Sequence, residues 1–265
     1  MLHDAAMATE PKTPRLAVLI DADNTSARIA PGLFQEIARL GEASTRRIYG
    51  DFSRARLKSW ADVLPTHAIT PHQNFANTSG KNASDIALVI DAMDLLHSGR
   101  FDGFCLVSSD SDFTRLAARI REQGVDVFGF GEQKTPESFI RACHKFIYTE
   151  NLRPGEPTAD QPERSDPRPA SALKPPSAAT PLIRTAIAQM DDEDGWVHLS
   201  GVRQRITNLA SDFDPRNFGH TKFIDLVEKS GAFEVRRNGP SAVYIRAKPT
   251  ARRKPASGKK KSPPG

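Results

Sequence analysis

Four aspartates in the first half of the chain have the residue type and spacing of a metal-dependent site. Asp21 closes an apolar run, and Asp110 and Asp112 follow a second apolar run after two serines. Asp85 opens a stretch whose apolar residues have helical spacing. In an open parallel sheet, the carboxyl ends of the strands and the amino ends of the following helices share one edge, where ligands bind. We therefore expect the four carboxylates to gather at one edge of a sheet.

Such a gathering of carboxylates predicts a hard divalent cation. Crowded carboxylates repel one another and raise each other's pKa unless a cation lies between them. Oxygen ligands favour Mg²⁺ or Mn²⁺, and such ions promote phosphodiester hydrolysis by neutralising the phosphate and activating water. Asn24, three residues after Asp21, can bring a neutral oxygen to the same place. Taken singly, Asp112 could cap a helix and Asp85 could supply first-turn charge.

Alternating strand and helix patterns over residues 15–150 predict an α/β domain built on a parallel sheet. The apolar runs and turn residues place strands at 16–20, 45–49, 67–70, 104–107 and 125–130, and helices at 31–40, 54–63, 84–97 and 111–123. Pro71 is expected to stop the third strand. Along the third helix, the spacing predicts a buried face made of Ile86, Val89, Ile90, Met93 and Leu96.

A second, smaller unit is expected at 182–247, after a proline-rich linker at 151–181. Helices are predicted at 182–190, 201–210 and 218–229, followed by strands at 233–235 and 243–245. The strands flank Asn238 and Gly239, a pair typical of a tight hairpin turn. Three helices and a hairpin predict a winged-helix domain.

Composition and charge limit the functional classes. The net charge is +5, yet residues 246–265 carry eight lysines and arginines and no acid. We therefore expect disordered ends at 1–14 and 248–265, the latter a basic tail that attracts polyanions. No apolar run is long enough to cross a bilayer, the first residues lack a secretory pattern, and two distant cysteines form no framework. A cytoplasmic protein without a membrane partner is expected.

Three segments together resemble the NYN domain, a family of PIN-like nucleases that includes the LabA-like proteins. They are residues 17–24 (AVLIDADN), 80–85 (GKNASD) and 107–113 (VSSDSDF), in the family's order. The resemblance implies a Rossmann-like sheet of order 3-2-1-4-5 and metal-dependent cleavage of nucleic acid, usually RNA. It transfers the family's acidic positions to Asp21, Asp85, Asp110 and Asp112, with Asn24 as a polar companion.

The second unit resembles the OST-HTH (LOTUS) module, through residues 195–200 (GWVHLS), 218–223 (FGHTKF) and the closing hairpin. This resemblance implies RNA binding and, in some members, protein partners. Candidate substrate contacts are Lys81 at the scissile phosphate or a leaving oxygen, Ser109 in the third NYN segment, Phe75 as a base-stacking ring and Lys222 in the second unit.

The residues and both resemblances favour a Mg²⁺- or Mn²⁺-dependent endoribonuclease with an appended RNA-binding module. Catalysis is expected from Asp21, Asn24, Asp85, Asp110 and Asp112, with metal on the four aspartates. Two alternatives stay open at this point. One is a non-catalytic RNA-binding or scaffold protein whose acidic site binds a metal or a nucleotide, and the other is a nuclease that acts on DNA.

Overall fold

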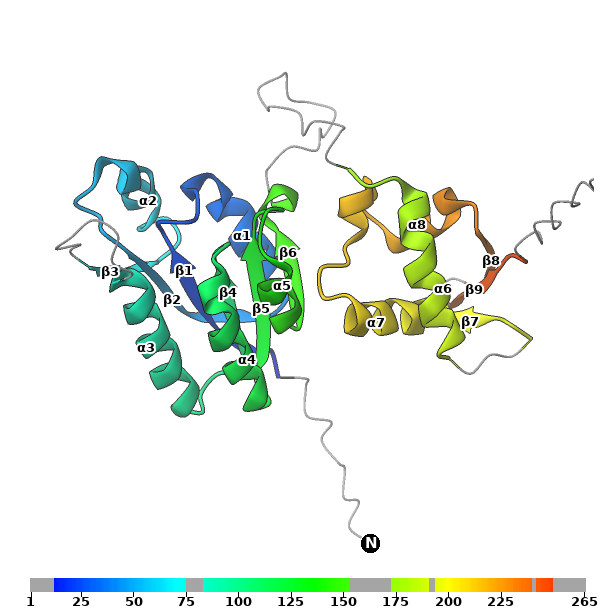
Figure 1. The fold of residues 1–265 in the computed structure, drawn as a ribbon, viewed down its shortest axis with the longest axis horizontal. Coiled ribbons are helices and arrows are strands. Elements are labelled where there is room, and N and C mark those ends of the chain that lie inside the picture. Colours follow the sequence, from blue (N-terminus) through cyan, green and yellow to red (C-terminus); the bar gives the residue numbers. More distant parts are fainter. Residues whose placement is uncertain (1–11, 75–82, 153–172, 191–193, 240–241, 250–265) are drawn as a thin grey trace, which may run out of the picture.

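The computed structural model describes residues 12–74, 83–152, 173–190, 194–239 and 242–249. These residues form a first domain around a parallel sheet and a second domain around a small antiparallel sheet (Figure 1). None of the helices in this described part combines the length and apolarity that a membrane crossing requires.

The first domain contains a six-stranded parallel sheet of order β3-β2-β1-β4-β5-β6. Its strands are β1 (Arg15–Asp21), β2 (Glu42–Gly50), β3 (Thr70–Gln73), β4 (Gly103–Val107), β5 (Asp126–Gly131) and β6 (Lys145–Tyr148). Its α-helices are α1 (Ala30–Ile37), α2 (Lys58–Val63), α3 (Ala83–His97), α4 (Thr114–Glu122) and α5 (Glu137–Ala142). Short 3-10 helices are η1 (Ala27–Ile29), η2 (Ala55–Leu57), η3 (Ser111–Phe113) and η4 (Thr149–Asn151). The expected order 3-2-1-4-5 is confirmed, and α5 and β6 extend it.

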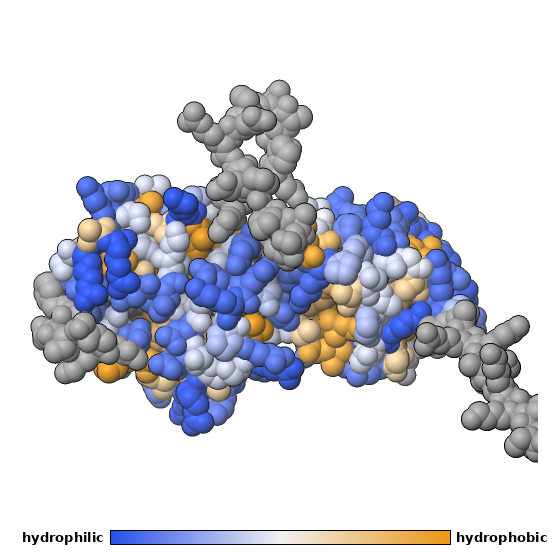
Figure 2. Space-filling model, turned by 45° about the horizontal axis from the view of Figure 1, so that its top comes forward, coloured by the Kyte–Doolittle hydropathy of each residue, from blue (hydrophilic) through white to orange (hydrophobic). Residues whose placement is uncertain are grey.

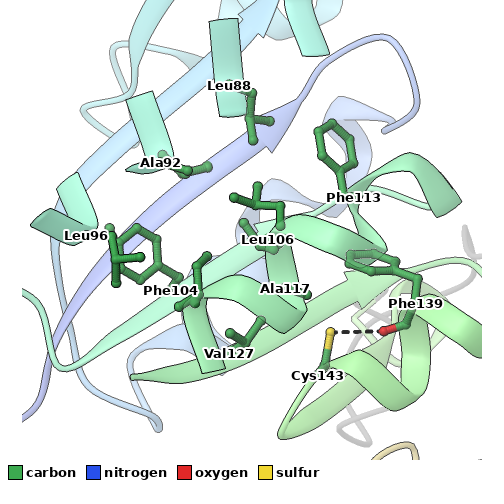
Figure 3. Packing of buried hydrophobic residues seen from close by; sticks show 14 of the residues in the cluster. Leu88, Ala92, Leu96, Phe104, Leu106, Phe113, Ala117, Val127, Phe139 and Cys143 are labelled. Carbon is green, nitrogen blue, oxygen red and sulfur yellow. Dashed lines mark hydrogen bonds between the residues drawn. The ribbon is translucent and has the colours of Figure 1, made fainter. Parts of the chain in front are cut away.

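Helices cover both faces of this sheet, because side chains along a strand alternate between the two faces. In β4, Phe104 and Leu106 pack against α3, α4 and α5, as Figure 3 shows. Cys105 and Val107 face the opposite core, under α1 and α2. All four side chains are buried, so β4 is a central strand that holds its carboxyl end in a fixed place.

Two details of the first domain differ from the sequence prediction. Pro71 lies inside β3 instead of ending a strand before it. Proline is tolerated there because β3 is an edge strand with only one hydrogen-bonded neighbour. In α3, Ile86 and Ile90 are 60% and 56% exposed, so their assignment to the buried face was wrong. This helix is apolar almost all round, and periodicity alone could not select its face.

The buried face of α3 consists instead of Leu88, Ala92, Leu95 and Leu96. These residues contact the core that lies over β1 and β4.

The second domain has three α-helices and a three-stranded antiparallel sheet of order β7-β9-β8. Its elements are η6 (Pro176–Ala179), α6 (Thr180–Ala188), β7 (Val197–His198), α7 (Leu199–Leu209), η7 (Pro215–Phe218), α8 (Phe223–Ser230), β8 (Phe233–Asn238) and β9 (Ala242–Ala247). Its core already includes Ala179, before the boundary expected at residue 182. The helix expected at 218–229 is divided, because Gly219 takes a left-handed conformation with φ of 78°.

The two domains touch along strand β6, the edge of the parallel sheet (Figure 1). The backbone N–H of Phe146 donates to the carbonyl of Ser211 at 2.8 Å, and the Tyr148 hydroxyl donates to Asp212 Oδ2 at 2.8 Å. The hydroxyl of Ser211 donates to the carbonyl of Ile140 at 2.7 Å. The space-filling view in Figure 2 shows a mostly hydrophilic surface running across both domains. The second domain thus covers part of an open sheet edge.

An ion-pair network joins the domains beside this edge. Glu36 of α1 is buried and accepts two hydrogen bonds from the Arg216 guanidinium, at 3.1 and 3.3 Å. Arg216 also pairs with Asp214 at 2.6 Å, and Lys145 lies 3.9 Å from Glu36. Burial lowers the pKa of Lys145, although Glu36 and Asp214 oppose that shift. Each charge in the network has an opposite charge beside it, as buried charges require.

Candidate active site

The carboxyl ends of β1 and β4 place Asp21 beside Ser108. In the parallel pairing, Ile20 lies opposite Val107, so the residues that follow them are neighbours. Asp21 has the same parity as Leu19, and Ser108 has the same parity as Leu106, so both point to the face covered by α3. Both are 2% exposed.

The Asp21 carboxylate is held by four hydrogen bonds from this edge. Ser108 Oγ and Asn24 Nδ2 donate to Oδ2 at 2.7 and 2.8 Å, and the backbone N–H groups of Asp23 and Asn24 donate to Oδ1 at 3.0 and 3.3 Å. Burial raises the pKa of Asp21, and these hydrogen bonds oppose the rise. The carboxylate is therefore fixed in orientation, with the amide nitrogen of Asn24 turned toward it.

Helix α3 brings Asp85 over the same edge. Asp85, Leu88, Ala92 and Leu95 follow one stripe of the helix at positions i, i+3, i+7 and i+10, and the last three are buried. Burial raises the pKa of Asp85 to about 6, and repulsion from Asp21, Asp110, Asp23 and Asp112 adds to the rise. Four other carboxylates thus lie near enough to Asp85 to repel its charge.

Asp110 and Asp112 lie at the corner between β4 and α4. Asp110 is the N-cap of η3, and its Oδ1 accepts a hydrogen bond from the backbone N–H of Asp112 at 2.9 Å. Ser108 Oγ accepts from the Asp110 backbone N–H at 3.0 Å, so one serine ties this corner to Asp21. Asp110 is half-buried and Asp112 is exposed. The corner presents Asp110 to the cluster while the same side chain stabilises the turn.

The site residues expected from the sequence did not include Ser108, Arg56 or Ser84, whose contacts organise the site. Ser108 contacts Asp21 directly, and its even spacing from Phe104 and Leu106 was the signal that places it on the Asp21 side of the strand. Asp23 accepts from Arg56 at 2.7 Å and from Ser84 Oγ at 3.3 Å. These contacts join the loop after β1 to η2 and to the start of α3. No short sequence pattern reports a contact of this kind.

The four candidate substrate contacts lie in different places. Ser109 accepts a hydrogen bond from the backbone N–H of Glu132 at 2.8 Å, on the loop after β5. Lys222 is exposed and precedes α8 in the second domain, so it does not belong to the aspartate cluster. Phe75 and Lys81 lie outside the described residues.

The carboxylates of the aspartate cluster can be compared with the ligands that a metal ion requires. Among the described residues, no three His, Cys, Asp or Glu side chains are close enough together to hold one metal ion as they stand. Burial nevertheless raises the pKa of Asp85, and repulsion from the neighbouring aspartates adds to the rise, which indicates negative charge at this edge. Mg²⁺ commonly keeps several waters and takes one or two carboxylates from the protein, with substrate phosphates completing its shell. The carboxylates therefore fit a hydrated hard ion better than an ion held by three direct protein ligands.

Comparison with protein families assigns the domain that carries this cluster. The NYN domain profile matches residues 15–150, slightly more than half of the chain. The chain belongs to the NYN family. The OST-HTH/LOTUS domain profile matches residues 174–245, which places a second known module after the NYN domain. The NYN domain belongs to the PIN-like nuclease superfamily, and OST-HTH/LOTUS domains bind RNA.

Solved structures resemble parts of this NYN chain. A protein of unknown function from Vibrio parahaemolyticus is 18% identical, with a TM-score of 0.44, over 53% of this chain and 95% of that one. An uncharacterized protein from Nitrosomonas europaea is 25% identical, with a TM-score of 0.27, over 37% of this chain and 95% of that one. At these TM-scores neither likeness adds to the assignment. No curated protein matches the chain.

Proposed function

We propose that this chain is a metal-dependent endoribonuclease whose reaction centre is the cluster of Asp21, Asp85, Asp110 and Asp112. The proposal is supported by the hydrogen bonds that tie Asp21 and the Asp110 backbone to Ser108 at the carboxyl edge of an NYN sheet, and by the repulsion that Asp85 experiences from both aspartates. Such an edge is where open α/β sheets bind their ligands. Repulsion between carboxylates is a cost that a structural role does not require, and a bound cation removes it.

The residues around the cluster have separate tasks in this proposal. Ser108 and Asn24 fix the Asp21 carboxylate through hydrogen bonds. Asp110 is held by its own helix cap. Asp85 completes the cluster or orients the attacking water.

Mg²⁺ or Mn²⁺ is the cofactor that this donor set favours, because carboxylate oxygens prefer hard ions. Bound among the four aspartates, the ion would neutralise the phosphate and lower the pKa of a water. Its presence would also relieve the repulsion that adds to the effect of burial in raising the pKa of Asp85.

RNA is the proposed substrate because an RNA-binding type of module is fixed beside the nuclease-type domain. The contacts along β6 keep both domains in one particle, so a strand held by one domain stays near the other. Protein partners of the second domain remain compatible with this arrangement.

A covalently closed, single-stranded RNA circle tests the proposal, because only an endonuclease can linearise a substrate without ends. EDTA-treated full-length protein is expected to leave the circle intact, and added Mg²⁺ or Mn²⁺ is expected to restore cutting. Asp110→Asn protein, purified in the same way, controls for contaminating nucleases.

The same assay separates the alternatives. Cutting of a DNA circle but not of the RNA circle would indicate a DNA nuclease. Binding of RNA without cutting, at all metal concentrations, would indicate the non-catalytic RNA-binding protein. Undiminished cutting in EDTA would contradict the metal-dependent mechanism.

A further inference from the structure

The small sheet of the second domain has a row of aromatic and basic side chains on its outer face. His198 of β7 lies opposite Tyr244 of β9, and Tyr244 lies opposite Arg236 of β8. Their neighbours in the next row, Val197 and Ile245, are buried in the domain core. Because side chains alternate along a strand, the row His198-Tyr244-Arg236 points away from the core. The Tyr244 and His198 rings contact each other, with centroids 5.3 Å apart.

Arg236 in this row is held by aromatic rings. Its guanidinium carbon lies 4.6 Å from the centroid of the Trp196 ring and 5.6 Å from that of Tyr244. Arg246 lies 4.8 Å from the same Trp196 ring but pairs with Glu234 at 2.6 Å. Within the part of the chain that the structure describes, Arg236 has no carboxylate partner. Its N–H donors are therefore positioned by the rings and available to a ligand.

Charge separates the hairpin of β8 and β9 from the helix that precedes it. Residues 233–248 contain four arginines and lysines and one acid, Glu234. Helix α8 contains Lys229 but two acids, Asp225 and Glu228. A polyanion is therefore attracted to the sheet and not to α8, the third helix of the domain.

We propose that the outer face of the β7-β9-β8 sheet binds single-stranded RNA, with Arg236 donating to a phosphate or base edge and Tyr244 stacking on an unpaired base. Exposed sheet faces that combine rings and arginines suit unstacked bases, whose faces are accessible only in single strands. The inference rests on the proposed function in one respect, that RNA is the ligand.

Binding by the full-length chain tests this surface independently of cutting. The Asp110→Asn background prevents cleavage, and fluorescence anisotropy with a labelled, unstructured RNA measures the dissociation constant. Arg236→Gln is expected to weaken binding at least about fivefold, the low end of the loss expected for a specific arginine contact. Arg237→Gln is the matched control, because it removes the same charge one residue away, from an arginine already paired with Glu228 at 2.8 Å. Its effect is expected to stay below about twofold.

Two further variants test the ring and the neighbouring acids. Tyr244→Leu keeps an apolar side chain on the strand and is expected to weaken binding, since it removes the stacking surface. In a protein that also carries Asp191→Asn, Asp192→Asn and Glu193→Gln, Arg236→Gln should still weaken RNA binding. That result would exclude these three acids as the cause of the lost affinity. Equal affinities of the Arg236→Gln and Arg237→Gln proteins would overturn the proposal. Failure of the endonuclease proposal would look different, with RNA bound through Arg236 but left intact by the wild-type chain.

Discussion

Asp110 has two roles at the corner after β4, because its carboxylate caps η3 and adds charge to the aspartate cluster. Asparagine caps a helix about as well as aspartate but carries no charge. Asp110→Asn should therefore keep the fold and lower the cleavage rate at least about a hundredfold, a loss typical of disturbed metal-site electrostatics. Rates on the RNA circle and thermal unfolding measure both effects. Asp94→Asn, an exposed change on α3, should retain activity, and a fully active Asp110→Asn protein would remove Asp110 from the mechanism.

Asp85 makes the stability of the metal-free protein depend on pH. Its pKa is about 6 in the folded state against 3.8 in an unstructured chain, so the folded state binds this proton more tightly. The resulting stabilisation is complete below about pH 4 and is lost as the pH rises through about 6. Asp85→Asn removes the titration, so its stability relative to wild type should grow by about 1 kcal/mol from pH 4 to pH 7, allowing for solvent screening. Urea unfolding in EDTA measures this difference, and a pH-independent difference would contradict it.

From the sequence, the four candidate aspartates were expected at one sheet edge with Asn24 beside Asp21, but Ser108 and Arg56 were not expected there. Aspartates at the ends of strands and the starts of helices can be placed from the sequence, because these positions share one edge of a parallel sheet. The Asp23–Arg56 pair joins residues 33 positions apart, and no local pattern reports such a contact. Choosing Ser108 over Ser109 as the serine beside Asp21 requires knowing which face of the sheet each serine follows. The sequence did not locate the end of β4 to within one residue, so it could not decide this.

Among the elements, the buried Glu36–Arg216 pair has the clearest effect on stability. Among the described residues, Arg216→Ala leaves Glu36 with the exposed Arg39 and the more distant Lys145 as its positive neighbours. Breaking a buried pair costs about 3–5 kcal/mol, and we expect about 2 kcal/mol here because these neighbours remain. Arg237→Ala, which breaks the exposed pair with Glu228, should cost less than about 1 kcal/mol. Chemical unfolding of both variants gives the comparison, and equal costs would show that the interface pair adds no stability.

Element prediction succeeded where the pattern was strong and local. The central strands β1 and β4 are continuous apolar runs, and they lie close to where the sequence placed them. The two-residue strand β7 is too short to leave a periodic signal. Strand β6 follows α5 after a single connecting pair of residues, so its pattern merges with that of the helix. The exposed Ile86 and Ile90 show that an apolar residue on a helix does not by itself identify the buried side.

For the molecule as a whole, the last residues should supply affinity without sequence preference. Residues 250–265 contain six arginines and lysines and no acid. Each phosphate that they neutralise on single-stranded RNA adds about −0.7 to the slope of log K against log salt. Deleting them should flatten that slope and weaken binding at low salt, with preference among RNA sequences unchanged. Replacing residues 250–265 by a neutral segment of equal length separates the effect of charge from that of chain length. An unchanged salt slope would show that residues 250–265 do not contact RNA.

The docking of the second domain against β6 also fixes the distance between the aspartate cluster and the second domain. Two modules joined only by a loose connection would let a bound strand be cut at many positions, because the reaction centre could sample a wide volume. Here Glu36, Arg216 and the β6 contacts set the separation between the aspartates and the sheet of the second domain. If one strand spans both, the bond that is cut lies a constant number of nucleotides from the anchored bases. The distance from the anchored bases to the cut bond would then be set by the domain interface and not by the length of residues 153–172.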